Sequence, residues 1–211
     1  MYEFLTLAIR EKDPKKPHDN FGVVVMDMNT KKIHSFALEK NEILSKSGDV
    51  FWDIGFITKV KDVSQKSDGK LVPSGFVAIK DARSSLKTIL ESKSINPEHF
   101  FSNRNVDYAI VRVSNVKDIT VEEDDYGTMK SRLTVSINGL PPSKKVDPLL
   151  NKDFRWIKYW SRIYKMDAVA EKKGQYIKLL NKKSKTLYLL LYRHTFSTGK
   201  KLYWIAGMHW L

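Results

Sequence analysis

The sequence contains no cysteine among its 211 residues. Disulfides, zinc sites built on thiolates and cysteine nucleophiles are therefore excluded. The same absence is typical of proteins from a reducing compartment, and we expect a cytoplasmic location. No apolar run approaches the roughly 18 residues needed to cross a bilayer, and the segment after Met1 lacks the pattern of a secretory signal. The sequence thus predicts no membrane partner.

The motifs of common catalytic and nucleotide-binding sites are also missing. The chain has no G-x-S-x-G, G-x-x-x-x-G-K-[ST] or G-x-G-x-x-G pattern. No two of its five histidines lie within five residues of each other, so we expect no metal and no cofactor. The acidic run Glu122–Asp125 is the best candidate for a nuclease site. Such a site needs carboxylates that converge on metal ions, whereas neighbouring residues at the end of one strand point alternately to opposite faces. We interpret it as a solvated hairpin tip and predict that the protein is not an enzyme.

Positive charge is in excess, and it is concentrated in the last third of the chain. Residues 141–211 contain 16 Lys and Arg against 4 Asp and Glu, whereas residues 1–140 contain 21 against 20. Codon bias would raise the lysine content along the whole chain, so it does not explain an excess confined to residues 141–211. The excess therefore indicates a functional role for the positive charge. A concentrated positive field attracts polyanions, nucleic acid above all. A solvated basic face and an acidic protein partner are the alternatives.

The apolar and β-branched patterning predicts a mainly β fold. In the first half we expect strands at residues 2–10, 21–28, 33–38, 50–60 and 75–80. The four residues Asn29–Lys32 favour a hairpin loop between the second and third of these strands. An amphipathic helix follows, with Asp81 as its N-cap and Ala82, Leu86, Ile89 and Leu90 on one face.

A second series of strands begins after the polar segment around Asn103. Strands are expected at residues 106–113, 116–123 and 132–137, then a helix that begins at Asp153, then two or three further strands. This is the element order of an oligonucleotide/oligosaccharide-binding (OB) barrel, in which a helix follows the third strand. We therefore predict two OB-like small β-barrels, each with a short capping helix, over residues 1–100 and 105–211.

The chain resembles the bacterial dual OB-containing domain family, which places two such barrels in one short chain. The resemblance is carried by the following segments: LTLAIREKDPKKP, FGVVVMD, SSLKTIL, IVRVSNVKDITV, Val146–Pro148 before Lys152–Trp160, and the closing YLLLYR and YWIAGMHW. It implies two OB-type barrels and a role in binding nucleic acid. It implies no catalytic residues.

Aromatic and basic residues are interleaved in the last third, which holds half of the 24 aromatic residues. Sites for single-stranded nucleic acid combine a cationic groove with aromatic faces on which bases stack. We assign Trp160 and Trp204 to the core, while Trp156 and Tyr159 belong either to the core edge or to an exposed platform. The lysines of residues 182–185 serve either phosphate contact or solubility. The predicted nucleic-acid-binding residues are Arg155, Trp156, Lys158, Tyr159, Arg162, Lys182, Lys183, Lys185 and Arg193.

These patterns together predict a non-enzymatic nucleic-acid-binding module. Its expected ligand is single-stranded DNA or RNA, and we expect an accessory subunit of a larger bacterial nucleic-acid-processing or defence complex. The alternative is a scaffold for a protein partner, in which tryptophans anchor the interface and no nucleic acid is bound.

Overall fold

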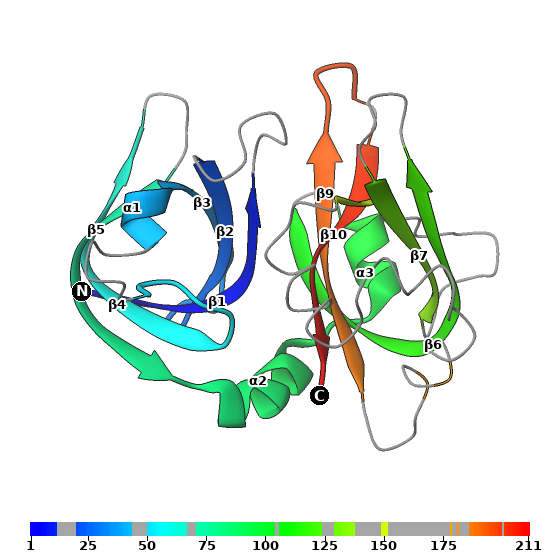
Figure 1. Ribbon diagram of the computed structural model, residues 1–211, viewed down its shortest axis with the longest axis horizontal. Coiled ribbons are helices and arrows are strands. Elements are labelled where there is room, and N and C mark those ends of the chain that lie inside the picture. Colours follow the sequence, from blue (N-terminus) through cyan, green and yellow to red (C-terminus); the bar gives the residue numbers. More distant parts are fainter. Residues whose placement is uncertain are drawn as a thin grey trace. The chain divides into compact units, whose positions relative to one another are not determined.

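The computed structural model describes residues 1–11, 20–43, 50–66, 71–103, 106–123, 129–137, 149–151, 178, 181, 186–199 and 201–211. The described chain is mainly β, as predicted, with a few short helices (Figure 1). It divides into two compact units, Met1–Thr88 and Ile89–Leu211.

The first unit is a closed five-stranded barrel. Its elements are β1 (Tyr2–Glu11), β2 (Asn20–Asp27), β3 (Ile33–Glu39), α1 (Lys40–Ile43), β4 (Phe56–Gln65) and β5 (Leu71–Asp81). The strands follow one another around the barrel in the order β1-β2-β3-β5-β4. β1 pairs antiparallel with both β2 and β4, and a parallel pairing of Phe36 with Leu71 joins β3 to β5. Figure 1 shows these strands curving around a common axis.

The hairpin predicted at Asn29 connects β2 to β3. Oδ1 of Asp27 accepts hydrogen bonds from the backbone N–H groups of Asn29 and Thr30, at 2.7 and 3.1 Å. Lys31 adopts a positive φ of 61°, and its N–H donates to the carbonyl of Asp27. The carboxylate of Asp27 therefore fixes the turn at the end of β2.

Aromatic side chains fill the core of the barrel. Phe4, Phe36 and Trp52 are buried and contact one another, with the rings of Phe4 and Phe36 edge to face at 5.0 Å. The strand predicted over 50–60 is wrong in its first half, because β4 begins at Phe56. Trp52 precedes β4 in a loop, and its large side chain packs in the barrel interior from that loop.

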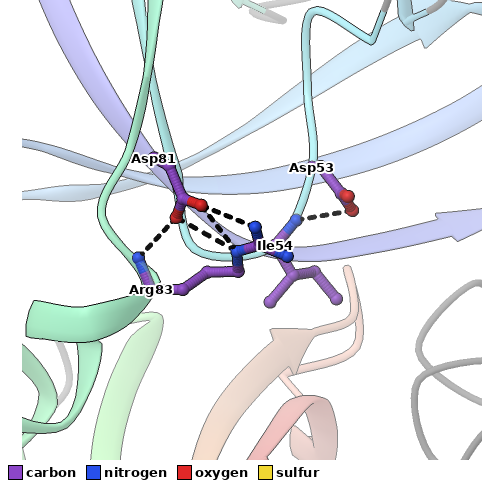
Figure 2. Close-up of polar contacts among 4 residues, drawn as sticks. All are labelled: Asp53, Ile54, Asp81 and Arg83. Atoms are coloured by element: carbon purple, nitrogen blue, oxygen red, sulfur yellow. Dashed lines mark hydrogen bonds and ion pairs between the residues drawn. The ribbon is translucent and has the colours of Figure 1, made fainter.

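Figure 2 shows Asp81 and Arg83 joined by hydrogen bonds where the chain leaves the barrel after β5. The carbonyl of Gly55, in the segment before β4, accepts from the N–H of Ala82 at this point. The N–H of Arg83 donates to Oδ1 of Asp81 at 2.9 Å, and the guanidinium of Arg83 also bonds this carboxylate. Gly55 has a φ of 84°, and a Cβ added there would lie 2.6 Å from Cγ of Arg83. Only glycine fits at this position without a shift of the backbone or of Arg83.

The amphipathic helix predicted after Asp81 forms, but in two pieces. A 3₁₀ turn, η1 (Arg83–Ser85), precedes α2 (Leu86–Lys93). The N-cap of the 3₁₀ turn is Ala82 and not the predicted Asp81. Asp81 lies one residue earlier, and its carboxylate accepts from the N–H of Arg83. Ala82, Leu86 and Leu90 are buried, which confirms the predicted apolar face.

The described strands of the second unit form a five-stranded sheet. The unit's elements after α2 are α3 (Pro97–Ser102), β6 (Tyr108–Glu123), β7 (Met129–Ile137), β8 (Leu149–Asn151), β9 (Leu187–Thr195) and β10 (Lys201–Trp210). The two strands predicted over 106–123 are one strand, β6, which keeps pairing with β7 through register shifts after Val113 and Val116. The helix predicted from Asp153 lies outside the described residues.

The described strands of this unit form an open sheet, in the order β10-β9-β6-β7-β8, where the sequence predicts a second barrel. Numbered from one to five along the chain, the strands of the second unit lie in the order 5-4-1-2-3. Those of the first unit close in the order 1-2-3-5-4. The two orders differ only at the pairing of strands three and five, which closes the first unit.

The division between the units falls earlier than the predicted 100/105 boundary. The segment from Ser94 to Asn103 belongs to the second unit, because its contacts are made there. The N–H of Ile95 donates to the carbonyl of Ile110, and Arg193 of β9 bonds the carbonyl of Asn103, at the end of α3. Such a boundary depends on contacts between residues far apart in the chain, which local composition does not reveal.

Candidate functional site

Eight of the nine predicted binding residues lie outside the described part of the chain. They are Arg155, Trp156, Lys158, Tyr159, Arg162, Lys182, Lys183 and Lys185. Their role in nucleic-acid binding stays a prediction.

Arg193 is described, and it is buried. Its side chain is 1% exposed, and Nη1 donates to the carbonyl oxygen of Asn103 at 2.5 Å. The guanidinium lies over the ring of Phe100, 5.7 Å from its centroid. Asp107 lies near, with Oδ1 3.9 Å from Nη2. Arg193 thus ties β9 to the end of α3, and the residue predicted to bind nucleic acid offers no surface to a phosphate in this arrangement.

The opposite face of β9, together with the adjoining end of β6, carries a row of aromatic rings. We call it the aromatic row and define it as Tyr108, Tyr192, His194 and Phe196. Tyr192, His194 and Phe196 are spaced by two residues, so their side chains share one face. Tyr108 of β6 is the register partner of Tyr192. The two tyrosine rings stack, with centroids 4.8 Å apart and planes inclined by 25°.

Contacts continue along the aromatic row from ring to ring. The hydroxyl of Tyr192 lies 3.2 Å from Nδ1 of His194, and the rings of His194 and Phe196 meet edge to face at 4.5 Å. Tyr108, Tyr192 and His194 are half-buried, and Phe196 is 39% exposed. Edge-to-face and stacked contacts of this kind hold rings in defined orientations while leaving part of each ring open to solvent.

The aromatic row ends at the hairpin between β9 and β10. The N–H of Gly199 donates to the carbonyl of Phe196 at 2.8 Å, and Gly199 adopts a φ of 78° with open space around it. Ser197, Thr198 and Gly199 are exposed. The row therefore leads from the middle of the sheet to an exposed loop.

Positive charge is distributed unequally between the two units. By sequence, the second unit contains 22 Lys and Arg against 12 Asp and Glu, and the first contains 15 against 12. Arg112 on β6 is exposed, and it lies four residues from Tyr108, on the same face of the strand. The aromatic row thus belongs to the unit with a balance of +10.

Sequence reasoning missed the aromatic row as a unit. Tyr192 and Phe196 were noted among the aromatic residues, but Tyr108 and His194 were not singled out. The signal in the sequence is Tyr192-x-His194-x-Phe196, the period-two pattern of one strand face. The pairing with Tyr108 could not be read locally, because Tyr108 and Tyr192 are 84 residues apart in the chain.

The acidic run at Glu122–Asp125 falls at the connection of β6 to β7, the position expected for a hairpin tip. Glu122 and Glu123 are the last residues of β6, paired with Lys130 and Met129, and Asp124 and Asp125 lie outside the described residues. Where the structure describes side chains, no three His, Asp or Glu residues are grouped as metal ligands.

In the described part of the chain, no helix has the length and apolar character needed to cross a bilayer. No family model matches this chain, and no curated protein matches it in sequence.

Proposed function

We propose that the protein is a non-enzymatic module that binds single-stranded nucleic acid through its second unit, as an accessory subunit of a larger nucleic-acid-processing assembly. The observation that carries this proposal is the aromatic row on a sheet face of the basic unit. Single-stranded sites combine a cationic surface with aromatic faces, and each stacked base contributes about 1–3 kcal/mol. Tyr108, Tyr192, His194 and Phe196 supply the aromatic faces.

The strand order supports assigning both units to the OB type. OB barrels have five strands and are partly open, and they bind oligonucleotides with the loops after the first and fourth strands. In the second unit, the loop after the fourth strand is the β9–β10 hairpin, which the aromatic row reaches at Phe196. In the first unit, α1 lies between the third and fourth strands, where a capping helix is expected. The same assignment agrees with the resemblance to the dual OB-containing domain family.

In the proposed complex, the rings stack on unpaired bases and the surrounding Lys and Arg side chains neutralise phosphates. The cations supply affinity without sequence preference, because phosphates are alike at every position. Stacking also tolerates any base, since every base has a π-face. A duplex hides the faces of its bases, so the row favours single strands.

The test is a fluorescence-anisotropy titration of the full chain with a labelled oligonucleotide, presented as single-stranded DNA, as RNA and as a duplex of the same sequence. We expect at least one single-stranded form to bind more tightly than the duplex. The double variant Tyr192→Ala with His194→Ala should weaken single-strand binding, whereas Val77→Ala, an exposed apolar position on β5, should not. Absence of binding to every form near physiological salt would contradict the proposal and favour the scaffold for a protein partner.

A further inference from the structure

One end of the first barrel holds a cavity of about 260 Å³. It lies where β1 begins, where the β2–β3 hairpin turns, and where β4 ends and β5 begins. Among the described residues, Tyr2, Phe4, His34 and Leu71 supply its apolar and aromatic lining, and Asp27 and Lys32 supply charged groups. The mouth of a β-barrel is a usual place for a small-molecule site.

Three rings shape the cavity. Tyr2 and Phe4 are two residues apart, so they share one face of β1. Their rings are parallel within 6°, with centroids 6.1 Å apart. The ring of His34 meets Phe4 edge to face, at 6.5 Å and 86°. Phe4 is 2% exposed and forms the floor, while Tyr2 is 38% exposed and forms part of the rim. A flat aromatic guest can therefore rest against the exposed ring of Tyr2, whose orientation is supported by its contact with Phe4.

The polar groups of the cavity come from the β2–β3 hairpin. Oδ1 of Asp27 is engaged by the N–H groups of Asn29 and Thr30, so this carboxylate serves the turn. Lys32 is exposed at the start of β3, two residues before His34. Burial lowers the pKa of His34 against the opposing effect of Asp27, with Lys32 lowering it further. His34 is thus neutral near pH 7, able to donate a hydrogen bond from one ring nitrogen and to accept one at the other.

The size and lining restrict the class of guest. Sites for drug-sized molecules run from about 300 to 1,000 Å³, so a cavity just below that range fits one small ring system. The rings favour a planar aromatic guest, and the ammonium of Lys32 at the rim favours an anionic group attached to it. We propose that the mouth of the first barrel binds one nucleotide, with its base against Tyr2, above the floor formed by Phe4, and its phosphate at Lys32.

This site goes beyond the proposed function, because it lies in the other unit and does not depend on the aromatic row. The same chemistry is offered by a free nucleoside monophosphate and by the phosphorylated end of a strand. Competition between the two distinguishes these sources.

The experiment follows the backbone and side-chain NMR signals of Tyr2, Lys32 and His34 in the full chain during titration with AMP. Adenosine and ribose 5-phosphate serve as probes that lack the phosphate or the base. We expect saturable shifts with AMP, and weaker binding of both partial probes. Tyr2→Ala should weaken AMP binding by at least about fivefold, the lower end of the range expected for loss of one stacking ring, while Tyr2→Phe retains it. Lys32→Gln should weaken AMP but not adenosine, and Lys31→Gln, exposed on the same turn, is the matched control.

A 5′-phosphorylated pentanucleotide that displaces AMP identifies the strand end as the natural guest, and one that does not identifies the free nucleotide. Unchanged signals at millimolar AMP, or AMP affinity that is the same in Tyr2→Ala and the parent protein, would overturn the proposal. Tyr192→Ala should leave the AMP shifts intact. Failure at the barrel mouth and failure of the aromatic row are therefore separate results.

Discussion

The ring of Tyr108 stacks on the ring of Tyr192, with 4.8 Å between their centroids. The two residues are directly opposed in the pairing of β6 with β9, so the contact joins the first and fourth strands of the second unit. A cross-strand aromatic pair contributes about 0.2–1 kcal/mol to a sheet relative to a pair of alanines. The modest size of that contribution means that these rings can be changed without unfolding the unit.

Replacing Tyr192 with alanine should therefore weaken the binding of single-stranded nucleic acid much more than it lowers stability. Loss of one stacked base predicts a loss of affinity of about 1–3 kcal/mol, about five- to 150-fold. Anisotropy titration and thermal unfolding of the same sample would measure both effects. Tyr192→Phe is the control, because it removes only the hydroxyl that lies near His194 and keeps the ring. An alanine variant that binds like the parent protein would remove the aromatic row from the interface.

Replacing Arg193 with methionine should lower stability and leave nucleic-acid binding unchanged, the reverse of the Tyr192 variant. The carbonyl of Asn103 would lose its donor in a buried place, which costs about 1–3 kcal/mol. Urea denaturation should register that loss in the free energy of unfolding. The salt dependence of nucleic-acid binding should not change, because a side chain that is 1% exposed neutralises no phosphate. A slope that becomes shallower by about 0.7, the value for one phosphate on a single strand, would show that Arg193 is a binding residue after all.

Stability should decrease as the pH falls below neutrality, and His34 is one cause. Burial places the pKa of His34 below its ordinary value of 6.5. Between that lowered pKa and 6.5, the unfolded chain binds the proton more strongly than the folded chain, so protonation favours unfolding. His34→Gln should flatten the dependence of the unfolding free energy on pH in this window. NMR titration of His34 checks the sign directly, and a pKa above 6.5 would contradict it.

A second loss of stability should occur at more acidic pH, through Asp27. Burial acts to raise the pKa of Asp27, but hydrogen bonds from Thr30 and Asn29 outweigh it and hold the pKa below 3.8. The folded state therefore keeps this carboxylate ionised more readily than the unfolded state does. The stabilisation is present above pH 3.8 and is lost as the pH falls through the lowered pKa. Asp27→Asn should remove that dependence, as measured by urea unfolding across the acidic range.

Two glycines with positive φ provide a matched comparison. Gly199→Ala meets open space, so its cost should be only the left-handed backbone conformation, about 1–2 kcal/mol. Gly55→Ala has the same conformational cost and also places Cβ 2.6 Å from Cγ of Arg83. The second variant should lose more unfolding free energy than the first. Equal losses in urea denaturation would mean that the turn beside Arg83 relaxes freely.

Local patterns in the sequence were sufficient for the barrel hairpin and for one helix face. Asp27 and Lys31 form a turn whose residues are contiguous, and Leu86 and Leu90 are spaced by one helical turn. Both depend on interactions within a few residues, which is the range over which periodicity and turn chemistry operate.

Other features depend on contacts that the local sequence does not encode. Trp52 lies within a run that reads as a strand, yet it enters the barrel core from a loop, where its ring contacts Phe4 and Phe36. The sequence predicts Arg193 as a nucleic-acid-binding residue, yet its side chain is buried and donates to the carbonyl of Asn103. Each outcome was decided by partners distant in the chain.

The central claim is that the basic unit binds single-stranded nucleic acid, and the slope of log affinity against log salt concentration tests it most directly. Each phosphate contact on a single strand contributes about 0.7 to the slope. If Lys182, Lys183 and Lys185 each contact a phosphate, changing all three to glutamine should reduce the slope by about 2. The same change at Lys12, Lys15 and Lys16 of the first unit should leave the slope as it is. A wild-type slope near zero, or equal reductions in the two triple variants, would contradict the account.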